Sequence, residues 1–360
     1  MNQNTIFLIL LALLSLFSCG EKDTTSEVII IDFNTDTTTI ETKSFLTDLS
    51  FYCQPYKSNN VYFLDKSQLT LSRINLNNNT LDSLTTFDIK NPPLAFLIQE
   101  SKEKVLFYHS ERIDEYDFNG VFLNTIELND IIHDEGVLTV QSQFFKPIFL
   151  KENLFMHYFP LISDSYKDSL FFQQPIEAKI NLKNKEFNFM KTTYPHNFRE
   201  NCFGFNFSPE RFLMNDGKRL GYSFPYNDSI FIEDFTTGKT QKHFFGIRTQ
   251  RPTFQYINFH EIKELNNHIF QELFMKNPSY SFATSFPLSG NYSRTLLERD
   301  EAKNVKTITC FYDNNLNYIG ETSENGIRGI LCDSNSGIVA ISAIWDKNEI
   351  HLTNLGWEQK

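Results

Sequence analysis

Short alternations of apolar and polar residues, separated by tight polar turns, recur along most of the chain. The clearest example lies between Val105 and Leu128, where two alternating stretches flank the pair Asn119-Gly120. An Asn-Gly pair in this setting is the strongest local signal for a β-hairpin. Five further turns have the same kind of flanks and are centred on Asn77-Asn78-Asn79, Lys183-Asn184-Lys185, Thr237-Gly238, Asp313-Asn314-Asn315 and Lys347-Asn348. The pattern predicts repeated units of strand, turn and strand.

A chain made of such units must pair or cover its strand edges, and four-stranded blades arranged around an axis do so with local contacts. We therefore predict an all-β fold, a six-bladed β-propeller that spans residues 28–360. Seven or eight blades are also compatible with the length, because a compact blade has about 40–45 residues. A β-sandwich is the alternative architecture.

One segment departs from the alternation and predicts a helical insertion near residues 256–278. Its apolar residues Ile262, Leu265, Ile269 and Leu273 follow helical spacing. A proline at position 278 ends the segment. We expect this helix to pack on the surface of the propeller.

The two ends of the predicted domain are expected to meet. The apolar segment Val28–Phe33 predicts a buried strand that pairs with Glu349–Leu355 in the last blade. Such pairing converts two exposed strand edges into one ladder and closes the ring. Deleting either end is therefore expected to destabilise the whole domain.

The N-terminus has the features of a bacterial lipoprotein signal. Ile6–Phe17 is an unbroken apolar run, and it is too short to cross a bilayer, which needs about 20 residues. Leu16-Phe17-Ser18-Cys19 stands where a lipobox would be, although Phe17 is bulky and no Lys or Arg precedes the run. We expect residues 1–18 to be a signal peptide, Cys19 to carry the lipid, and residues 19–27 to form a tether. An uncleaved helical anchor or a plain secretory signal is the alternative.

These features predict an outer-membrane lipoprotein of the cell envelope, attached to the membrane by its N-terminal lipid. Glu21, Lys22 and Asp23 follow the predicted anchor closely. Acidic residues at this place resemble the surface-export signal of Bacteroidetes lipoproteins, but a solvated tether has a similar composition. Periplasm-facing and surface-exposed orientations both stay open.

Two stretches resemble sequences of Bacteroidetes lipoproteins from a domain-of-unknown-function family. They are Arg219–Ile230 (RLGYSFPYNDSI) and Asn277–Tyr280 (NPSY), and the lipobox fits the same likeness. The resemblance implies a six-bladed, TolB-like propeller body and an envelope location. It implies no activity, because the family has no established catalytic residues.

Composition supports a folded chain and argues against one class of partner. The 360 residues are 41% hydrophobic and 15% aromatic, with 37 Phe and 15 Tyr, as expected of a β-rich globular domain. The net charge is -11. Nucleic-acid binding requires clustered Lys and Arg that neutralise phosphates, so no nucleic-acid partner is predicted.

No motif for metal or cofactor chemistry is complete. Thr237–Thr240 (TGKT) resembles the end of a phosphate-binding loop, but Glu233 stands in place of the required first Gly. His260 begins a zinc-binding spacing, but Glu264 replaces the second His. One acidic cluster is more consistent with a solvated loop than with a cation site, and it comprises Asp130, His133, Asp134 and Glu135. We predict no metal site, no cofactor and no catalytic residue.

Four cysteines remain after the predicted lipid-attachment site, namely Cys53, Cys202, Cys310 and Cys332. Cys310 and Cys332 lie in neighbouring strand units and form the first candidate for a disulfide. Four buried thiols are the alternative.

The leading functional hypothesis is a binding or scaffold module for an envelope protein, peptide or glycan. The candidate exposed aromatic residues are Tyr222, Phe224, Tyr226 and Tyr280, although aromatic residues within strands more often belong to the core. The alternative is an envelope hydrolase or lyase with its site in the central channel. That alternative would use scattered residues such as His109, His196, Asp228 or Arg294.

Overall fold

In the computed structural model of the chain, the described residues are 29–31, 34–41, 51–132, 137–139, 147–159, 170–204, 208–249, 251–261, 267–300, 304–327, 329–344 and 348–356. The predicted signal peptide, the tether and Cys19 lie outside these residues. So do three members of the acidic cluster, namely His133, Asp134 and Glu135.

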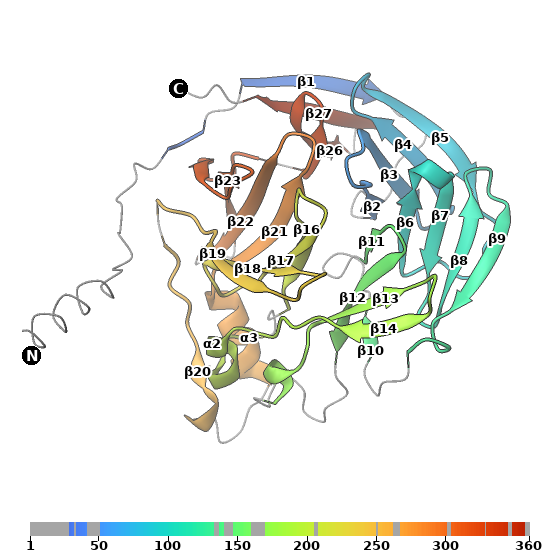
Figure 1. Cartoon of the computed structure of the whole chain (residues 1–360). Coiled ribbons are helices and arrows are strands. Elements are labelled where there is room, and N and C mark those ends of the chain that lie inside the picture. Colours follow the sequence, from blue (N-terminus) through green and yellow to red (C-terminus); the bar gives the residue numbers. More distant parts are fainter. Residues whose placement is uncertain are drawn as a thin grey trace, which may run out of the picture.

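Six antiparallel blades are arranged in a ring, as predicted (Figure 1). Blade 1 consists of β2 (Tyr52–Cys53), β3 (Asn60–Asp65), β4 (Thr70–Asn75) and β5 (Thr80–Thr86). Blade 2 consists of β6 (Ala95–Gln99), β7 (Lys104–Tyr108), β8 (Arg112–Asp117) and β9 (Phe122–Glu127). Blade 3 consists of β10 (Val137–Thr139), β11 (Ile148–Leu150), β12 (Asn153–Phe159), β13 (Glu177–Asn181) and β14 (Glu186–Phe189). Blade 4 consists of β16 (Glu210–Leu213), β17 (Arg219–Ser223), β18 (Ser229–Asp234) and β19 (Thr240–Phe244). Blade 5 consists of β21 (Ser279–Phe286), β22 (Asn291–Arg299), β23 (Val305–Tyr312) and β24 (Tyr318–Glu321). Blade 6 consists of β25 (Ile330–Ser334), β26 (Gly337–Ile344), β27 (Glu349–Gly356) and β1 (Asn34–Glu41).

All six predicted turns connect paired strands. The first five join the third strand of a blade to its fourth, and the turn at Asn348 joins the second to the third because β1 supplies the fourth strand of blade 6. In the first five turns, a side-chain oxygen at the end of the third strand accepts the backbone N–H two residues later. The acceptors are Asn75, Asp117, Asn181, Asp234 and Asp313. These Asx turns define each hairpin locally.

The N-terminal strand closes the ring, but the predicted segment was wrong. β1 pairs antiparallel with β27 over its whole length, from Asn34 opposite Gly356 to Glu41 opposite Glu349. Within the predicted strand, Ile30 instead forms a parallel bridge to Glu321 at the edge of blade 5. The outermost strand of a blade faces solvent, so a polar, Thr-rich segment suits that place better than an apolar one.

The hydrophobic core is divided among the blade interfaces. Six buried clusters each combine residues from two neighbouring blades. The cluster between blades 1 and 6, for example, packs Val61 and Phe63 against Val339 and Ile341. Each blade therefore depends on both neighbours, and the core is continuous only when the ring is closed.

The predicted helical insertion is confirmed over residues 267–276 and lies beside blades 4 and 5 (Figure 1), while Ile262 and Leu265 lie outside the described residues. Helix α3 (Asn267–Lys276) packs on a two-stranded sheet, because Leu273 and Cys202 share a small apolar cluster. The two-stranded sheet consists of β15 (Asn201–Cys202) and β20 (Ile257–Asn258). Helix α2 (His196–Glu200) precedes β15, and the 3-10 turn Phe259–Glu261 follows β20. Two more 3-10 turns follow β6 and precede β13, at Glu100–Lys102 and Phe171–Gln173.

Candidate functional site

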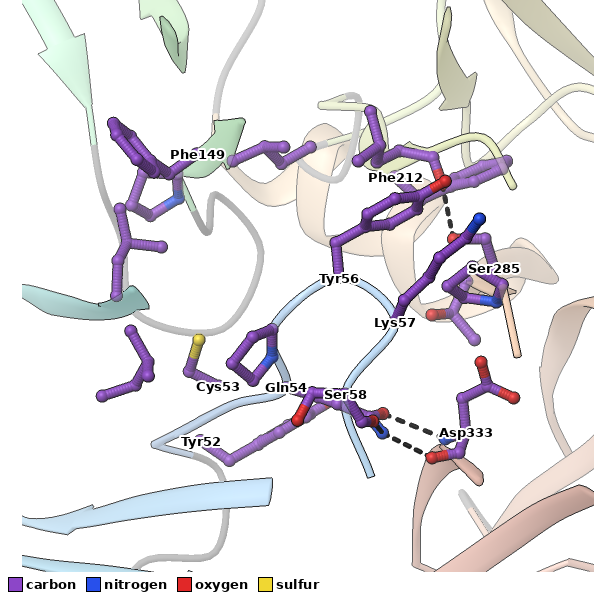
Figure 2. A pocket seen from close by; sticks show the side chains of 18 of the residues that line it. Tyr52, Cys53, Gln54, Tyr56, Lys57, Ser58, Phe149, Phe212, Ser285 and Asp333 are labelled. Carbon is purple, nitrogen blue, oxygen red and sulfur yellow. Dashed lines mark hydrogen bonds between the residues drawn. The ribbon is translucent and has the colours of Figure 1, made fainter. Parts of the chain in front are cut away.

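A cavity of about 260 Å³ lies on the propeller axis and is lined by the innermost strand of every blade (Figure 2). Apolar and aromatic side chains form much of the wall, among them Phe96, Phe149, Phe212 and Leu213. Polar groups come from blade 1, which contributes residues 51–58, and from blade 5, which contributes Thr284 and Ser285. A concave apolar site with a few polar groups is the usual form of a ligand site.

The loop after β2, residues 54–58, crosses one end of the channel. From blade 1, Tyr56 Oη donates to the carbonyl of Asn215 in blade 4, on the opposite side of the ring, at 2.7 Å. Gln54 Nε2 donates to the carbonyl of Asp333 in blade 6 at 2.6 Å, and the Asp333 N–H donates to Gln54 Oε1 at 2.9 Å (Figure 2). The loop is thus fixed to two other blades.

A glycine in blade 4 makes room for Tyr56. A Cβ at Gly217 would lie 3.0 Å from the hydroxyl of Tyr56, and its backbone has φ +64°, which favours glycine. Burial raises the pKa of Tyr56, and the nearby charge of Asp216 acts in the same direction. Tyr56 is therefore a protonated donor at neutral pH.

A buried ion pair stands behind the cavity wall. Arg211 Nη1 donates to both carboxylate oxygens of Glu177, at 2.6 and 2.7 Å, and both side chains are at most 1% exposed. Burial raises the pKa of Glu177, while the charge of Arg211 lowers it. Burial and the same guanidinium keep the pKa of His157 well below its usual value, so this imidazole is neutral. Arg211 lines the cavity, but Glu177 neutralises its charge.

The acidic residue of the cavity has its own partners. Asp333 is buried, and its carboxylate accepts the N–H of Ser289 at 3.1 Å and the N–H of Leu288. Burial raises the pKa of Asp333, and these two hydrogen bonds lower it. The side chain stabilises a turn of blade 5, and because it is buried, its carboxylate presents little surface to a ligand.

Lys57 is the cavity-lining cation without such compensation. Its side chain is exposed, and Nζ lies 5.4 Å from the centre of the Tyr56 ring. Among the residues that the structure describes, Lys57 has no ion-pair partner. Its backbone has φ 60°, the left-handed region that lysine rarely adopts.

The four aromatic residues predicted to be exposed are buried, so that expectation was wrong. Tyr222, Phe224 and Tyr226 belong to the core between blades 3 and 4, and Tyr280 belongs to the core between blades 4 and 5. Side chains on the inner three strands of a blade pack against the next blade, which is why these rings face inward. On β21 the exposed aromatic residue is Phe282, which is 61% exposed and has φ 54°.

The residues considered for hydrolysis do not meet in the channel, and none of them lines the cavity. His109 lies near Asp114 in blade 2, at 3.3 Å, and His196 is exposed on α2. Asp228 accepts the hydroxyl of Tyr280 at 2.9 Å.

Arg294 is fully buried. Its guanidinium donates to the carbonyls of Phe224, Asn227 and Phe245 and stacks 3.8 Å from the centre of the Tyr280 ring. These contacts join blades 4 and 5, so they have a structural explanation.

The disulfide candidate is not formed. Cys310 lies in the core between blades 4 and 5, and Cys332 lies between blades 1 and 6. Burial raises the pKa of the Cys310 thiol to about 12. All four cysteines of the described residues are thiols, and Cys53 is the one that lines the cavity.

The described residues contain neither a group of metal ligands nor a helix able to span a membrane. Within those residues, no three His, Cys, Asp or Glu side chains are grouped so that they could hold a metal ion. Asp130, the described member of the acidic cluster, lies 4.0 Å from Lys185 Nζ. In the same part of the chain, none of the helices has the length and apolar character needed to span a membrane.

No known protein-family profile matches the chain, and no curated protein matches it in sequence. Solved structures do resemble it in fold. A member of the DUF4221 family from Bacteroides vulgatus superimposes with a TM-score of 0.68 at 13% identity, over 92% of this chain and 98% of that one. The shared feature is the fold. A putative exported protein from Bacteroides fragilis gives a TM-score of 0.49 at 10% identity, over 89% of this chain and 95% of that one. The Bacteroides vulgatus structure confirms the expected resemblance to Bacteroidetes proteins of unknown function at the level of the fold.

Proposed function

We propose that the protein is a lipid-anchored binding module of the cell envelope, whose ligand occupies the cavity on the propeller axis. The observation that carries the proposal is the construction of the cavity. All six innermost strands line it, and the fixed loop 54–58 crosses it. A rigid site of this kind is organised before its ligand arrives, which lowers the entropic cost of binding.

The position of the chain start is compatible with an anchor. β1 is the outermost strand of blade 6, and Ile30 lies at the outer edge of blade 5 (Figure 1). A tether from Cys19 would reach the propeller at its rim, away from the axis. The lipid would therefore hold the protein at the membrane and leave the cavity open to a protein, peptide or glycan.

The electrostatics favour binding over catalysis. The cavity-lining charges of Arg211 and Asp333 are engaged by Glu177 and by backbone N–H groups. A general acid or base must reach its substrate with a free proton or lone pair. Arg211 and Asp333 are held in this way and give the wall a fixed shape, whereas Lys57, which has no ion-pair partner among the described residues, is left to contact a ligand.

Filling the cavity is expected to abolish ligand capture. Thr284→Trp would place an indole in the cavity, because Thr284 lines it and is partly exposed. Purified protein would be immobilised and incubated with detergent-solubilised envelope, and the retained material would be identified by mass spectrometry. Material retained by the natural protein should be missing with Thr284→Trp.

The matched control is Ser83→Trp, an exposed position on β5 at the outer rim of blade 1. This variant should retain the same material as the natural protein. Circular dichroism would establish that both variants are folded. If folded Thr284→Trp captures the same material as Ser83→Trp, the ligand does not occupy the cavity and the proposal fails.

A further inference from the structure

The charged side chains that line the cavity indicate the chemical class of its ligand. The chain has 44 acidic and 33 basic residues, so an average lysine in it has carboxylates available nearby. Arg211 is neutralised by Glu177. Asp333 is held by two backbone N–H groups. Asp333 is buried, whereas Lys57 is exposed, so among the described residues the ammonium of Lys57 is the cavity-lining charge most accessible to a ligand.

The loop that carries Lys57 is held in one defined conformation. A φ of 60° is strained for lysine, whereas glycine or asparagine adopts it at lower cost. Hydrogen bonds from Gln54 and Tyr56 to other blades hold the loop in this form. Lys151 and Lys185 have the same left-handed backbone and do not line the cavity, so this conformation reports a fixed loop, and the case for Lys57 rests on its place in the cavity wall.

The wall around Lys57 defines the rest of the ligand. Figure 2 shows Lys57 beside Tyr56 and near Phe212 and Ser285. One ammonium can balance a single negative charge. Phosphate groups are usually bound by arginine forks or several cations, but the guanidinium of Arg211 is already engaged by Glu177. A carboxylate joined to an apolar or aromatic group matches these surroundings.

We propose that the cavity binds the C-terminal carboxylate of a peptide that ends in an apolar or aromatic residue, with Lys57 as its counter-ion. This inference rests on the proposed function and specifies its ligand. The carboxylate accepts hydrogen bonds from Lys57 Nζ, and the terminal side chain packs against the aromatic wall. The size of the cavity limits the bound segment to the last one or two residues.

The test compares two probes that differ only in the proposed charge. N-acetyl-Ala-Phe and its C-terminal amide would each be titrated into the full mature protein by isothermal calorimetry. The acid is expected to bind about tenfold more tightly than the amide. Its affinity should fall with added salt, because the pairing is electrostatic. Equal binding of acid and amide would overturn the inference.

Variants of Lys57 test whether this residue causes the difference in affinity between the acid and the amide. Lys57→Gln should remove the difference between acid and amide, and Lys57→Arg should keep it. Lys218→Gln is the matched control, because Lys218 is an exposed lysine beside Gly217 and does not line the cavity. This control should retain the full difference. A difference that persists in Lys57→Gln would contradict the role of this residue.

Other outcomes separate this inference from the proposed function. If neither probe binds while Thr284→Trp still abolishes capture from the envelope, the peptide assignment is wrong and the binding function stands. Binding of glucuronate in place of the acid probe would likewise overturn the peptide assignment in favour of a glycan. Should Lys57→Gln fail to fold, the ratio of acid to amide binding and its salt dependence in the natural protein still decide the question.

Discussion

Replacing Glu177 by Leu is expected to lower the free energy of unfolding by about 3–5 kcal/mol, because it leaves a buried guanidinium without its carboxylate. Arg211 and Glu177 are at most 1% exposed, so water cannot take the place of the lost partner. Denaturation by guanidinium chloride at pH 7, followed by circular dichroism, would measure the change. The effect is large because the pair joins blades 3 and 4 next to the cavity.

The double variant Glu177→Leu with Arg211→Met separates the cost of leaving a buried charge unpaired from the loss of the attraction between the two charges. Replacing both charges by apolar side chains of similar size removes the desolvation penalty together with the attraction. The double variant should therefore recover most of the stability lost in Glu177→Leu. A loss below about 1 kcal/mol for Glu177→Leu, the size of an exposed ion pair, would show that the pair is not buried as described.

Removal of β1 is expected to have the second large effect. A chain that begins at residue 42 lacks the eight-residue ladder with β27. Each backbone hydrogen bond contributes about 1 kcal/mol net, and part of that is offset by the entropy of ordering the strand, so a loss of roughly 4 kcal/mol is expected. Leu352 and Ile350 would lose the cover that Ile40 gives their cluster. Thermal melting followed by circular dichroism would measure the change.

Two longer chains serve as references for that truncation. A chain that begins at residue 34 keeps β1 and lacks residues 21–33, which include the Ile29–Ile31 segment with its two backbone hydrogen bonds to Glu321. It should melt between the chain that begins at residue 21 and the one that begins at residue 42. Equal melting temperatures for the longest and the shortest chain would mean that the ring does not depend on its N-terminal strand.

The blade pattern could be predicted because its signals are local. Asx residues and positive-φ positions such as Gly120 and Asn79 determine each hairpin within a few residues, whatever the rest of the chain does. The polar strand β1 was missed for the opposite reason. Its sequence, NTDTTTIE, is polar apart from Ile40 and carries no apolar alternation. The high β-propensity of its threonines was the available signal.

The site could not be predicted from sequence because it exists only at the axis of the closed ring. Tyr56 and Lys57 lie in a polar loop, and nothing local shows that this loop reaches blade 4. The aromatic residues chosen in their place, such as Tyr222 and Tyr280, lie within strands, and those strands bury them between blades. The loop between β2 and β3 is longer than the loops after the innermost strands of the other blades, and this length was the one available signal of the site.

The central claim, that ligands occupy the axial cavity, is tested most directly by the reactivity of Cys53. This thiol lines the cavity and is partly exposed, whereas Cys202, Cys310 and Cys332 are buried and act as internal controls. Protein that begins at residue 21 would be treated with iodoacetamide, with and without solubilised envelope, and modification would be followed by peptide mass spectrometry. Cys53 is expected to react first, and bound envelope material should slow its modification severalfold. Binding of that material with no change in the rate at Cys53 would contradict the account.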